Sequence, residues 1–178
     1  MFKAVKKWVI KRNLRKSMKT RKRHKGFYNF KTAKTVGIIF VYDHLVLQAV
    51  EELKAFLSAK NIQCKALAYY LDKEVPLKLV GNPYIRYFNK HEVNWCCKCL
   101  SAEANLFINQ NFDILIDFSI TNIPIMRHLP LLSLAKMKVG RYSYPDHPYD
   151  FVLSDSNAKP GVFVEALKHY LLTIDMIN

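Results

Sequence analysis

Short apolar runs alternate with amphipathic segments over most of the chain. Residues 35–42 (TVGIIFVY) form a nearly continuous apolar, β-branched run, which is typical of a strand covered on both faces. The next segment has Asp43 as a candidate N-cap, and its apolar residues recur with a helical period, which predicts a helix lying on a sheet. Its apolar stripe consists of Val46, Val50, Leu53 and Leu57. Residues 63–71 predict a second strand, so this region should form a right-handed βαβ unit.

The same alternation continues to the end of the chain. Residues 113–119 (DILIDFS) predict the clearest buried strand after the first, and weaker apolar runs predict strands at 84–88, 137–142 and 151–154. Strands that alternate with helices indicate an α/β fold with a mostly parallel sheet and helices on both faces. We therefore expect a single Rossmann-like, doubly wound sheet of five to six strands over residues 35–178. The expected strand order is 3-2-1-4-5-6.

The helices of the second half have recognisable starts. Ser101 is expected to cap one helix, and Asn122, followed by Pro124, is expected to start the next. Pro130 should kink or divide that second helix because proline has no backbone N–H to donate. A closing helix should begin near Pro160 and turn one apolar stripe inward. That stripe consists of Phe163, Leu167, Tyr170 and Ile174.

Residues 1–34 differ from the rest of the chain and predict a basic arm. The first 25 residues contain no Pro or Gly and are rich in Lys and Arg, which predicts one long helix that Gly26 caps in a left-handed conformation. A short aromatic stretch follows this helix. We expect its side chains to pin the arm to the domain by packing, and they are Phe27, Tyr28 and Phe30.

The net charge of the protein lies entirely in this arm. The 178 residues include 28 Lys and Arg and 14 Asp and Glu, which gives a formal net charge of +14. Half of the cations and none of the acids precede residue 35, so the domain that follows carries 14 charges of each sign. A neutral domain with a cationic extension indicates a polyanionic partner.

RNA is the polyanion that fits the arm best. On a helical wheel, Lys6 and Lys7 interrupt the apolar stripes of the arm, so cations surround the helix. A membrane-surface helix needs a clean apolar half, whereas a helix among RNA phosphates benefits from cations on every side. The residues expected to bind RNA are Lys3, Lys6, Lys7, Lys11, Arg12, Arg15, Lys16, Lys19, Arg21, Lys22, Arg23 and Lys25.

Three segments carry a resemblance to known families: the basic N-terminal helix, the KTVGIIF strand and the stretch FDILIDFSITNIPIMRHLPLLSLAKMKVGRYS. Together they resemble a family of small bacterial proteins known only as a domain of unknown function, over essentially the whole chain. The long stretch is also distantly similar to the N-terminal domain of heptosyltransferase-type glycosyltransferases, in which a buried strand ending in Asp leads through a helix to a Lys-x-Val-Gly strand. This second resemblance implies a Rossmann-like fold. It does not imply transferase activity, because those enzymes close a nucleotide-sugar site between two domains, whereas this chain is expected to form only one.

The cysteines do not predict a metal site. An H-x4-C-C-x-C pattern is formed by His91, Cys96, Cys97 and Cys99. Structural zinc usually takes paired C-x2-C elements, and two adjacent cysteines do not easily point at one ion. Cys64 falls on a predicted strand, where it is expected to be a small core residue. No cofactor is expected, and the clustered thiols indicate a reducing cytoplasm.

The ends of the strands offer a second candidate site. In open α/β sheets, ligands bind where the strand order reverses, here between the first and fourth strands. The residues expected in this crevice are Asp43, His44, Ser119, Thr121, Asn122 and Arg141. Asp43 and Asn122 have a simpler interpretation as helix caps. The first strand-to-helix turn lacks a Gly-rich loop, and no common hydrolase, zinc-protease or P-loop motif occurs, so the sequence does not support an enzyme.

These patterns lead to three hypotheses. The first is a cytoplasmic, non-catalytic RNA-binding accessory protein that associates with ribosomal particles and contacts their proteins. The second is a peripheral membrane protein that binds an anionic membrane surface, with Phe2, Val5, Trp8 and Val9 as apolar anchors. It would be peripheral because no apolar run is long enough to span a membrane. The third is a ligand-binding protein or an enzyme related to glycosyltransferases that uses the strand-end crevice.

Overall fold

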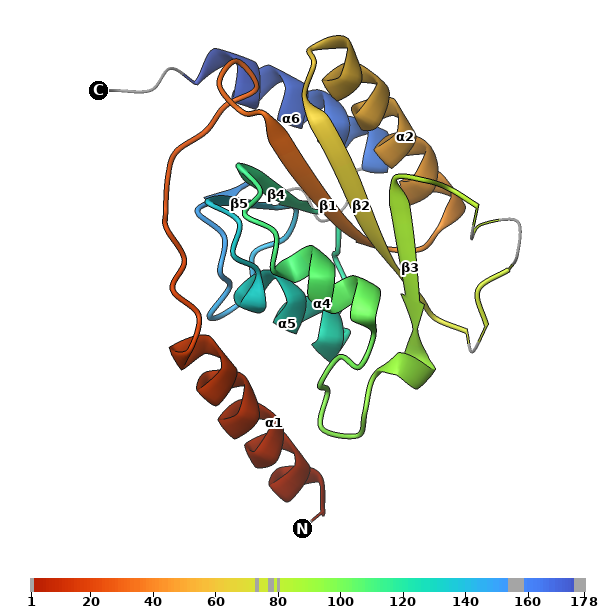
Figure 1. Cartoon of the computed structure of the whole chain (residues 1–178), viewed down its shortest axis with the longest axis vertical. Coiled ribbons are helices and arrows are strands. Elements are labelled where there is room, and N and C mark those ends of the chain that lie inside the picture. Colours follow the sequence, from red (N-terminus) through yellow and green to blue (C-terminus); the bar gives the residue numbers. More distant parts are fainter. Residues whose placement is uncertain (1, 73, 77–78, 80, 154–158, 175–178) are drawn as a thin grey trace.

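The protein is described by a computed structural model, which places residues 2–72, 74–76, 79, 81–153 and 159–174. Its centre is a six-stranded parallel sheet in the order β3-β2-β1-β4-β5-β6 (Figure 1). The predicted fold class and strand order are therefore confirmed. The sixth strand is short, and Ser154, at its predicted end, lies outside the described residues. From edge to edge the strands are β3 (Ile85–Asn89), β2 (Gln63–Tyr70), β1 (Thr35–Val41), β4 (Ile114–Asp117), β5 (Met137–Gly140) and β6 (Phe151–Val152).

Helices cover both faces of the sheet: α2 (His44–Ala59) and α6 (Pro160–Thr173) on one, α4 (Ala102–Ile108) and α5 (Pro124–Leu132) on the other (Figure 1). The alternation of side chains along β1 explains the two layers. Ile38 and Phe40 join the core formed with α2 and α6, whereas Ile39 joins the core formed with α4 and α5. A strand that is apolar on both faces is stable only when both faces are covered.

Two of the predicted helix caps are present. Asp43 Oδ1 accepts hydrogen bonds from two backbone N–H groups in the first turn of α2, at 2.8 and 3.3 Å. Ser101 Oγ accepts one from the first turn of α4 at 3.4 Å. These side chains satisfy N–H groups that have no partner within their own helix.

Two predictions for α5 were wrong: the Asn122 cap and the division of the helix at Pro130. Ile123, not Asn122, holds the N-cap position, and the side-chain oxygen of Asn122 accepts a hydrogen bond from Arg127 instead. Pro124 begins the helix without a side-chain cap because its ring presets the backbone angle. Pro130 does not divide α5, since it lies in the last turn, where little helix remains to be disrupted.

The inward face of α6 also differs from the prediction. Tyr170 is 45% exposed, and Leu171 is fully buried in its place. The buried side chains Phe163, Leu167 and Leu171 recur at intervals of four, so the face turned to the sheet is rotated away from Tyr170. Ile174 follows the helix as its C-cap residue.

The basic helix, α1 (Phe2–Lys19), ends earlier than predicted. Among the described residues no glycine has a positive φ, so Gly26 is not a left-handed cap. The chain after α1 runs along the side of the domain towards β1 (Figure 1). There the N–H of Gly26 donates to the carbonyl oxygen of Lys136 at 3.1 Å. Acceptors on the domain thus replace the helical hydrogen bonds that a longer α1 would have made.

The aromatic stretch pins the arm to the domain through two of its three residues. Phe30 is buried, Tyr28 packs against the same core, and Phe27 is exposed. The Phe30 N–H donates to the carbonyl oxygen of Leu171 at 2.8 Å. Asn29 Nδ2 donates to the carbonyl oxygen of Ile174 at 2.9 Å, which ties this stretch to the end of α6.

Candidate nucleic-acid interface

The helix α1 has two faces with different surroundings. At about 100° per residue, positions 10, 14 and 17 form one stripe, and positions 8, 12, 15 and 19 form a second stripe on roughly the opposite side. The first stripe lines a cleft between α1 and the domain and consists of Ile10, Leu14 and Ser17. The second stripe points to solvent. With its flanking lysines it forms the outer face, which consists of Trp8, Lys11, Arg12, Arg15, Lys16 and Lys19.

The outer face combines an exposed aromatic ring with unpaired cations. Its side chains enclose a furrow of about 380 Å³. Trp8 is 59% exposed, and Cζ of Arg12 lies 5.2 Å from the centroid of its ring, within the range of a cation–π contact. In the described structure none of the outer-face cations forms an ion pair. The outer face is therefore a positively charged surface that offers one flat apolar ring.

The linker after α1 turns two arginines towards the domain. Arg21 Nη1 donates to the carbonyl oxygen of Leu132 at 2.5 Å. Arg23 donates from Nε to the carbonyl oxygen of Ala135 at 2.7 Å and from Nη2 to that of Lys136 at 2.8 Å. Leu132 ends α5, and the last carbonyls of a helix lack helical partners and carry the negative end of its dipole. The Leu132 carbonyl attracts the guanidinium group of Arg21, and the carbonyl oxygens of Ala135 and Lys136, beyond the end of α5, hold that of Arg23. Together they fix the linker.

Further charges lie around this attachment. Arg23 forms an ion pair with Asp150, and Lys25 Nζ lies 3.5 Å from Asp150 Oδ1. Lys138 is only 2% exposed, and its Nζ donates to the carbonyl oxygen of Pro130 at 2.6 Å. Burial lowers the pKa of Lys138 to about 7, and the positive charge of Arg23 acts in the same direction.

The structure divides the predicted RNA-binding cations into three groups. Arg21 and Arg23 are hydrogen-bonded to the domain. Lys3 and Lys7 belong to α1, but their side chains lie outside the described part of the protein. The remaining side chains are exposed, and they are Lys6, Lys11, Arg12, Arg15, Lys16, Lys19, Lys22 and Lys25.

Four of the six residues predicted for the strand-end crevice are used in local contacts or face solvent. The Asp43 carboxylate caps α2, and the Asn122 amide accepts from Arg127. His44 and Thr121 are exposed. The simpler interpretation of Asp43 as a helix cap is therefore confirmed, and that of Asn122 as a helix cap is wrong.

A buried polar pair near these residues was not predicted as a site. Asp117, at the end of β4, is 1% exposed, and the Tyr149 hydroxyl donates to its Oδ2 at 2.6 Å. Burial raises the pKa of Asp117 to about 6, although the hydrogen bond from Tyr149 acts in the opposite direction. The Tyr149 ring lies against Gly140, where an added Cβ would come within 2.3 Å of the ring. Nearby, Arg141 is buried, and the buried Oγ of Ser119 has no hydrogen-bond partner among the described residues.

Only the Asp117 half of this pair had a signal in the sequence. An Asp that closes an apolar strand is conspicuous, but Tyr149 lies in a turn segment far along the chain. For the outer face, the spacing of Trp8 and Arg12 by one helical turn was the available signal.

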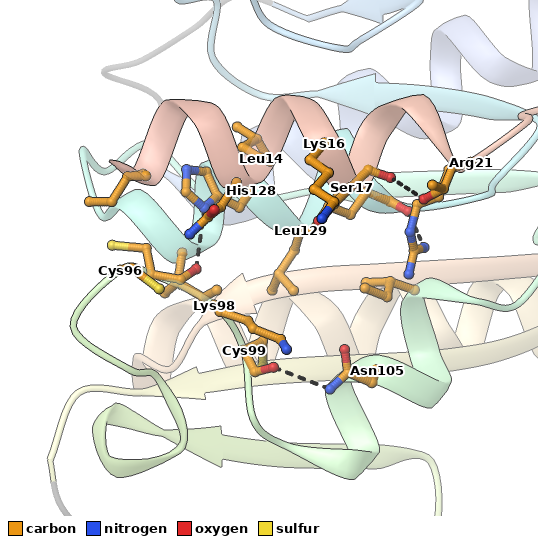
Figure 2. Close-up of a pocket in the computed structure, with 17 residues that line it drawn as sticks. Leu14, Lys16, Ser17, Arg21, Cys96, Lys98, Cys99, Asn105, His128 and Leu129 are labelled. Atoms are coloured by element: carbon orange, nitrogen blue, oxygen red, sulfur yellow. Dashed lines mark hydrogen bonds between the residues drawn. The ribbon is translucent and has the colours of Figure 1, made fainter. Parts of the chain in front are cut away.

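The cysteine cluster lies on the loop between the short 3-10 turn η1 (Lys90–Glu92) and α4, at one end of the cleft (Figure 2). The described residues contain no group of three or more His, Cys, Asp or Glu side chains placed to hold a metal ion. The Cys96 thiol donates to Asn94 Oδ1 at 3.1 Å. Burial raises the pKa of Cys97 and of Cys99, so both thiols are protonated at neutral pH.

Comparison with known proteins supports the first of the two resemblances. The family described as "Family of unknown function (DUF6913)" matches residues 6–174, which confirms the predicted resemblance to an uncharacterised family. Neither the curated proteins nor the solved structures include a match to the chain. The similarity to glycosyltransferases stays a prediction. Within the described structure, every helix is too short or too polar to cross a bilayer.

Proposed function

Because the chain belongs to the DUF6913 family, whose function is unknown, we propose a function from its own geometry: a non-catalytic RNA-binding accessory protein. The observation that carries this proposal is the outer face of α1. It presents five cations without acidic partners and one exposed indole ring. Cations hold the phosphate backbone, and an exposed aromatic ring stacks on an unpaired base. We therefore propose that the outer face binds RNA that contains unpaired nucleotides.

The direction in which α1 presents its apolar side chains favours RNA over a membrane surface. Ile10 and Leu14 line the cleft on the domain side, so they do not contribute to a face that could lie on a membrane. Val5 and Trp8 are exposed, but Arg12 lies between them on the helical wheel. A lipid-binding helix would need a continuous apolar face turned away from the domain.

The same geometry predicts how binding depends on salt. If the five cations of the outer face each neutralise one phosphate, counterion release gives a slope of log affinity against log salt of about −4.5 on duplex RNA and about −3.5 on single strands. Phosphate contacts carry no sequence information, so selectivity must come from the shape of the RNA or from protein contacts.

A ribosomal particle is the partner that we propose, because it offers RNA and protein surfaces side by side. Trp95, on the loop between η1 and α4, is 64% exposed. The neighbouring Cys97 is close enough to α1 for Lys6 to influence its thiol. Trp95 therefore provides an apolar contact close to the basic helix, suited to a ribosomal protein next to the bound RNA.

The proposal is tested with two matched triple variants of the full-length protein. One variant combines Lys11→Ala, Arg15→Ala and Lys19→Ala on the outer face. The control replaces three exposed lysines of the domain and combines K60A, K65A and K90A. We expect RNA affinity and cosedimentation with ribosomes to fall at least tenfold for the first variant and less than twofold for the control.

Two results would count against this function. Equal RNA binding by both triple variants would remove the outer face from the interaction. Flotation with anionic vesicles, combined with no retention on RNA at low salt, would instead favour the membrane surface.

A further inference from the structure

A cleft of about 470 Å³ lies between the inner face of α1 and the domain (Figure 2). Its volume falls in the range of about 300–1,000 Å³ that is typical of sites for small molecules. The floor is aliphatic and is formed by Ile108, Ile125, Leu129 and Leu132. The roof is formed by α1 through Ile10 and Leu14. An aliphatic ligand would displace water from apolar surface on both sides.

The charge of the cleft is positive. Lys16 enters it from α1, and Lys98 enters it from the loop on the opposite side (Figure 2). Of the 17 residues that line the cleft in the described structure, none is an Asp or a Glu. Neither lysine forms an ion pair among the described residues. Arg21, at one end, is already bonded to the carbonyl oxygen of Leu132.

The other polar side chains of the cleft do not add charge. His128 Nδ1 lies 3.3 Å from the carbonyl oxygen of Cys97, and burial lowers the pKa of His128, so the imidazole is neutral at pH 7. Asn105 Nδ2 already donates to the carbonyl oxygen of Ser101 at 2.7 Å. No Phe, Tyr or Trp lines the described cleft, so a nucleobase would find no aromatic ring on which to stack.

We propose that this cleft binds a small organic anion with an aliphatic body, of the class of medium-chain carboxylates. The aliphatic part covers the leucine and isoleucine floor, and the carboxylate lies between the ammonium groups of Lys16 and Lys98. Burial of the aliphatic part supplies most of the affinity, and the two lysines select for an anion. The cleft shares Lys16 with the outer face of α1, but Lys98 and the floor residues lie outside that face, so Lys98→Ala tests the cleft without removing a cation of the outer face.

The test uses the full-length protein and decanoate, below its micelle-forming concentration, at low ionic strength. Isoleucine and leucine methyl groups are followed by NMR during the titration. We expect the largest shifts at Ile108, Ile125 and Leu129. Lys98→Ala, which leaves the outer face intact, should weaken decanoate binding about three- to fivefold, because exposed lysine–carboxylate pairs are individually weak. The control Lys60→Ala, outside the cleft, should leave the affinity unchanged.

Three results would overturn the proposal. The first is the absence of saturable shifts at the floor residues. The second is the same decanoate affinity for Lys98→Ala as for the natural protein. The third is an equal response to adenosine monophosphate, which would contradict the aliphatic class of ligand. RNA binding is measured on the same variant, where no change is expected, so a failure of this site and a failure of the RNA-binding function are distinguished.

Discussion

The helix α1 and the linker that follows it have the same basic composition but use their cations in opposite ways. On α1, Arg12 and Arg15 point to solvent and have no acidic partner among the described residues. In the linker, Arg21 and Arg23 point to the domain and donate to its carbonyl oxygens. A few residues therefore separate a surface that can bind a polyanion from an attachment that holds the arm in place.

The reason for this difference lies in the domain and not in the arm. The end of α5 and the segment after it present carbonyl groups without helical partners, together with the carboxylate of Asp150. Arg21 and Arg23, which lie within reach of these acceptors, turn inward. The cations farther along α1 meet only solvent on one side, so they keep their charge available for a partner. Within one short basic segment, some cations can thus attach the chain to the domain while others stay free to bind a partner.

The largest effect is expected at the attachment. Arg23→Ala removes hydrogen bonds to two carbonyl oxygens and the ion pair with Asp150, so we expect the free energy of unfolding to fall by about 2–4 kcal/mol. Urea denaturation measures this change. Lys22→Ala, at an exposed neighbouring position, should change the free energy of unfolding by less than about 0.5 kcal/mol. Similar losses for both variants would show that the inward direction of Arg23 does not matter.

A second large effect is expected on the outer face, without a change in stability. Trp8→Ala should weaken the binding of single-stranded RNA by about 1–3 kcal/mol, because a stacked base loses its aromatic partner. Trp8→Phe should retain most of the affinity. Fluorescence titration at fixed salt measures binding, and thermal denaturation checks the fold. A loss of stability in Trp8→Ala would show that this ring helps to hold the fold together and does not serve RNA binding alone.

An intermediate effect is expected from the pH dependence of the attachment. Lys138 has a pKa of about 7 in the folded protein and about 10.4 in the unfolded chain, so the unfolded state binds more protons between these values. The free energy of unfolding should therefore rise with pH, by about 2 kcal/mol between pH 7 and pH 9. Lys138→Met should flatten this dependence in urea denaturation at several pH values. An unchanged slope would assign the dependence to other groups.

The smallest effect is expected for Lys25, which is close to an acidic partner, as Arg23 is, but exposed, as the cations of α1 are. Its Nζ is 3.5 Å from Asp150 Oδ1, but the side chain is 74% exposed. Lys25→Ala should change the free energy of unfolding by less than about 0.5 kcal/mol, because exposed ion pairs are weak. RNA affinity should fall by about twofold, as measured by filter binding, if Lys25 also contacts phosphate. A large loss of stability would move Lys25 to the same role as Arg23.

Much of the fold could be predicted because its signals are local. The apolar run that became β1 and the capping side chains Asp43 and Ser101 act over a few residues. The errors occur where a distant group decides the outcome. The helix α1 ends early because the carbonyl oxygen of Lys136 and other acceptors on the domain bind the linker. Asn122 does not cap α5, because its side-chain oxygen accepts a hydrogen bond from Arg127.

The residue types of the candidate site could be predicted from the sequence, but not the directions in which their side chains point. The concentration of cations in the arm indicated a polyanion, and Trp8 and Arg12 were visible as neighbours on a helix. The pairing of Lys16 with Lys98 across a cleft could not be predicted, because these residues come together only when α1 lies on the domain. The contact between Asp117 and Tyr149 depends in the same way on the packing of a late loop against β4.

The sequence by itself determined the alternation of strands and helices and the asymmetry of charge, because hydrophobic period and residue charge are properties of short segments. The strand order followed from the doubly wound fold class that this alternation indicates. The tertiary structure decided where α1 ends, which arginines face the domain and which remain exposed. That decision depends on carbonyl groups and carboxylates more than 100 residues away along the chain. Only folding brings such acceptors within hydrogen-bonding distance.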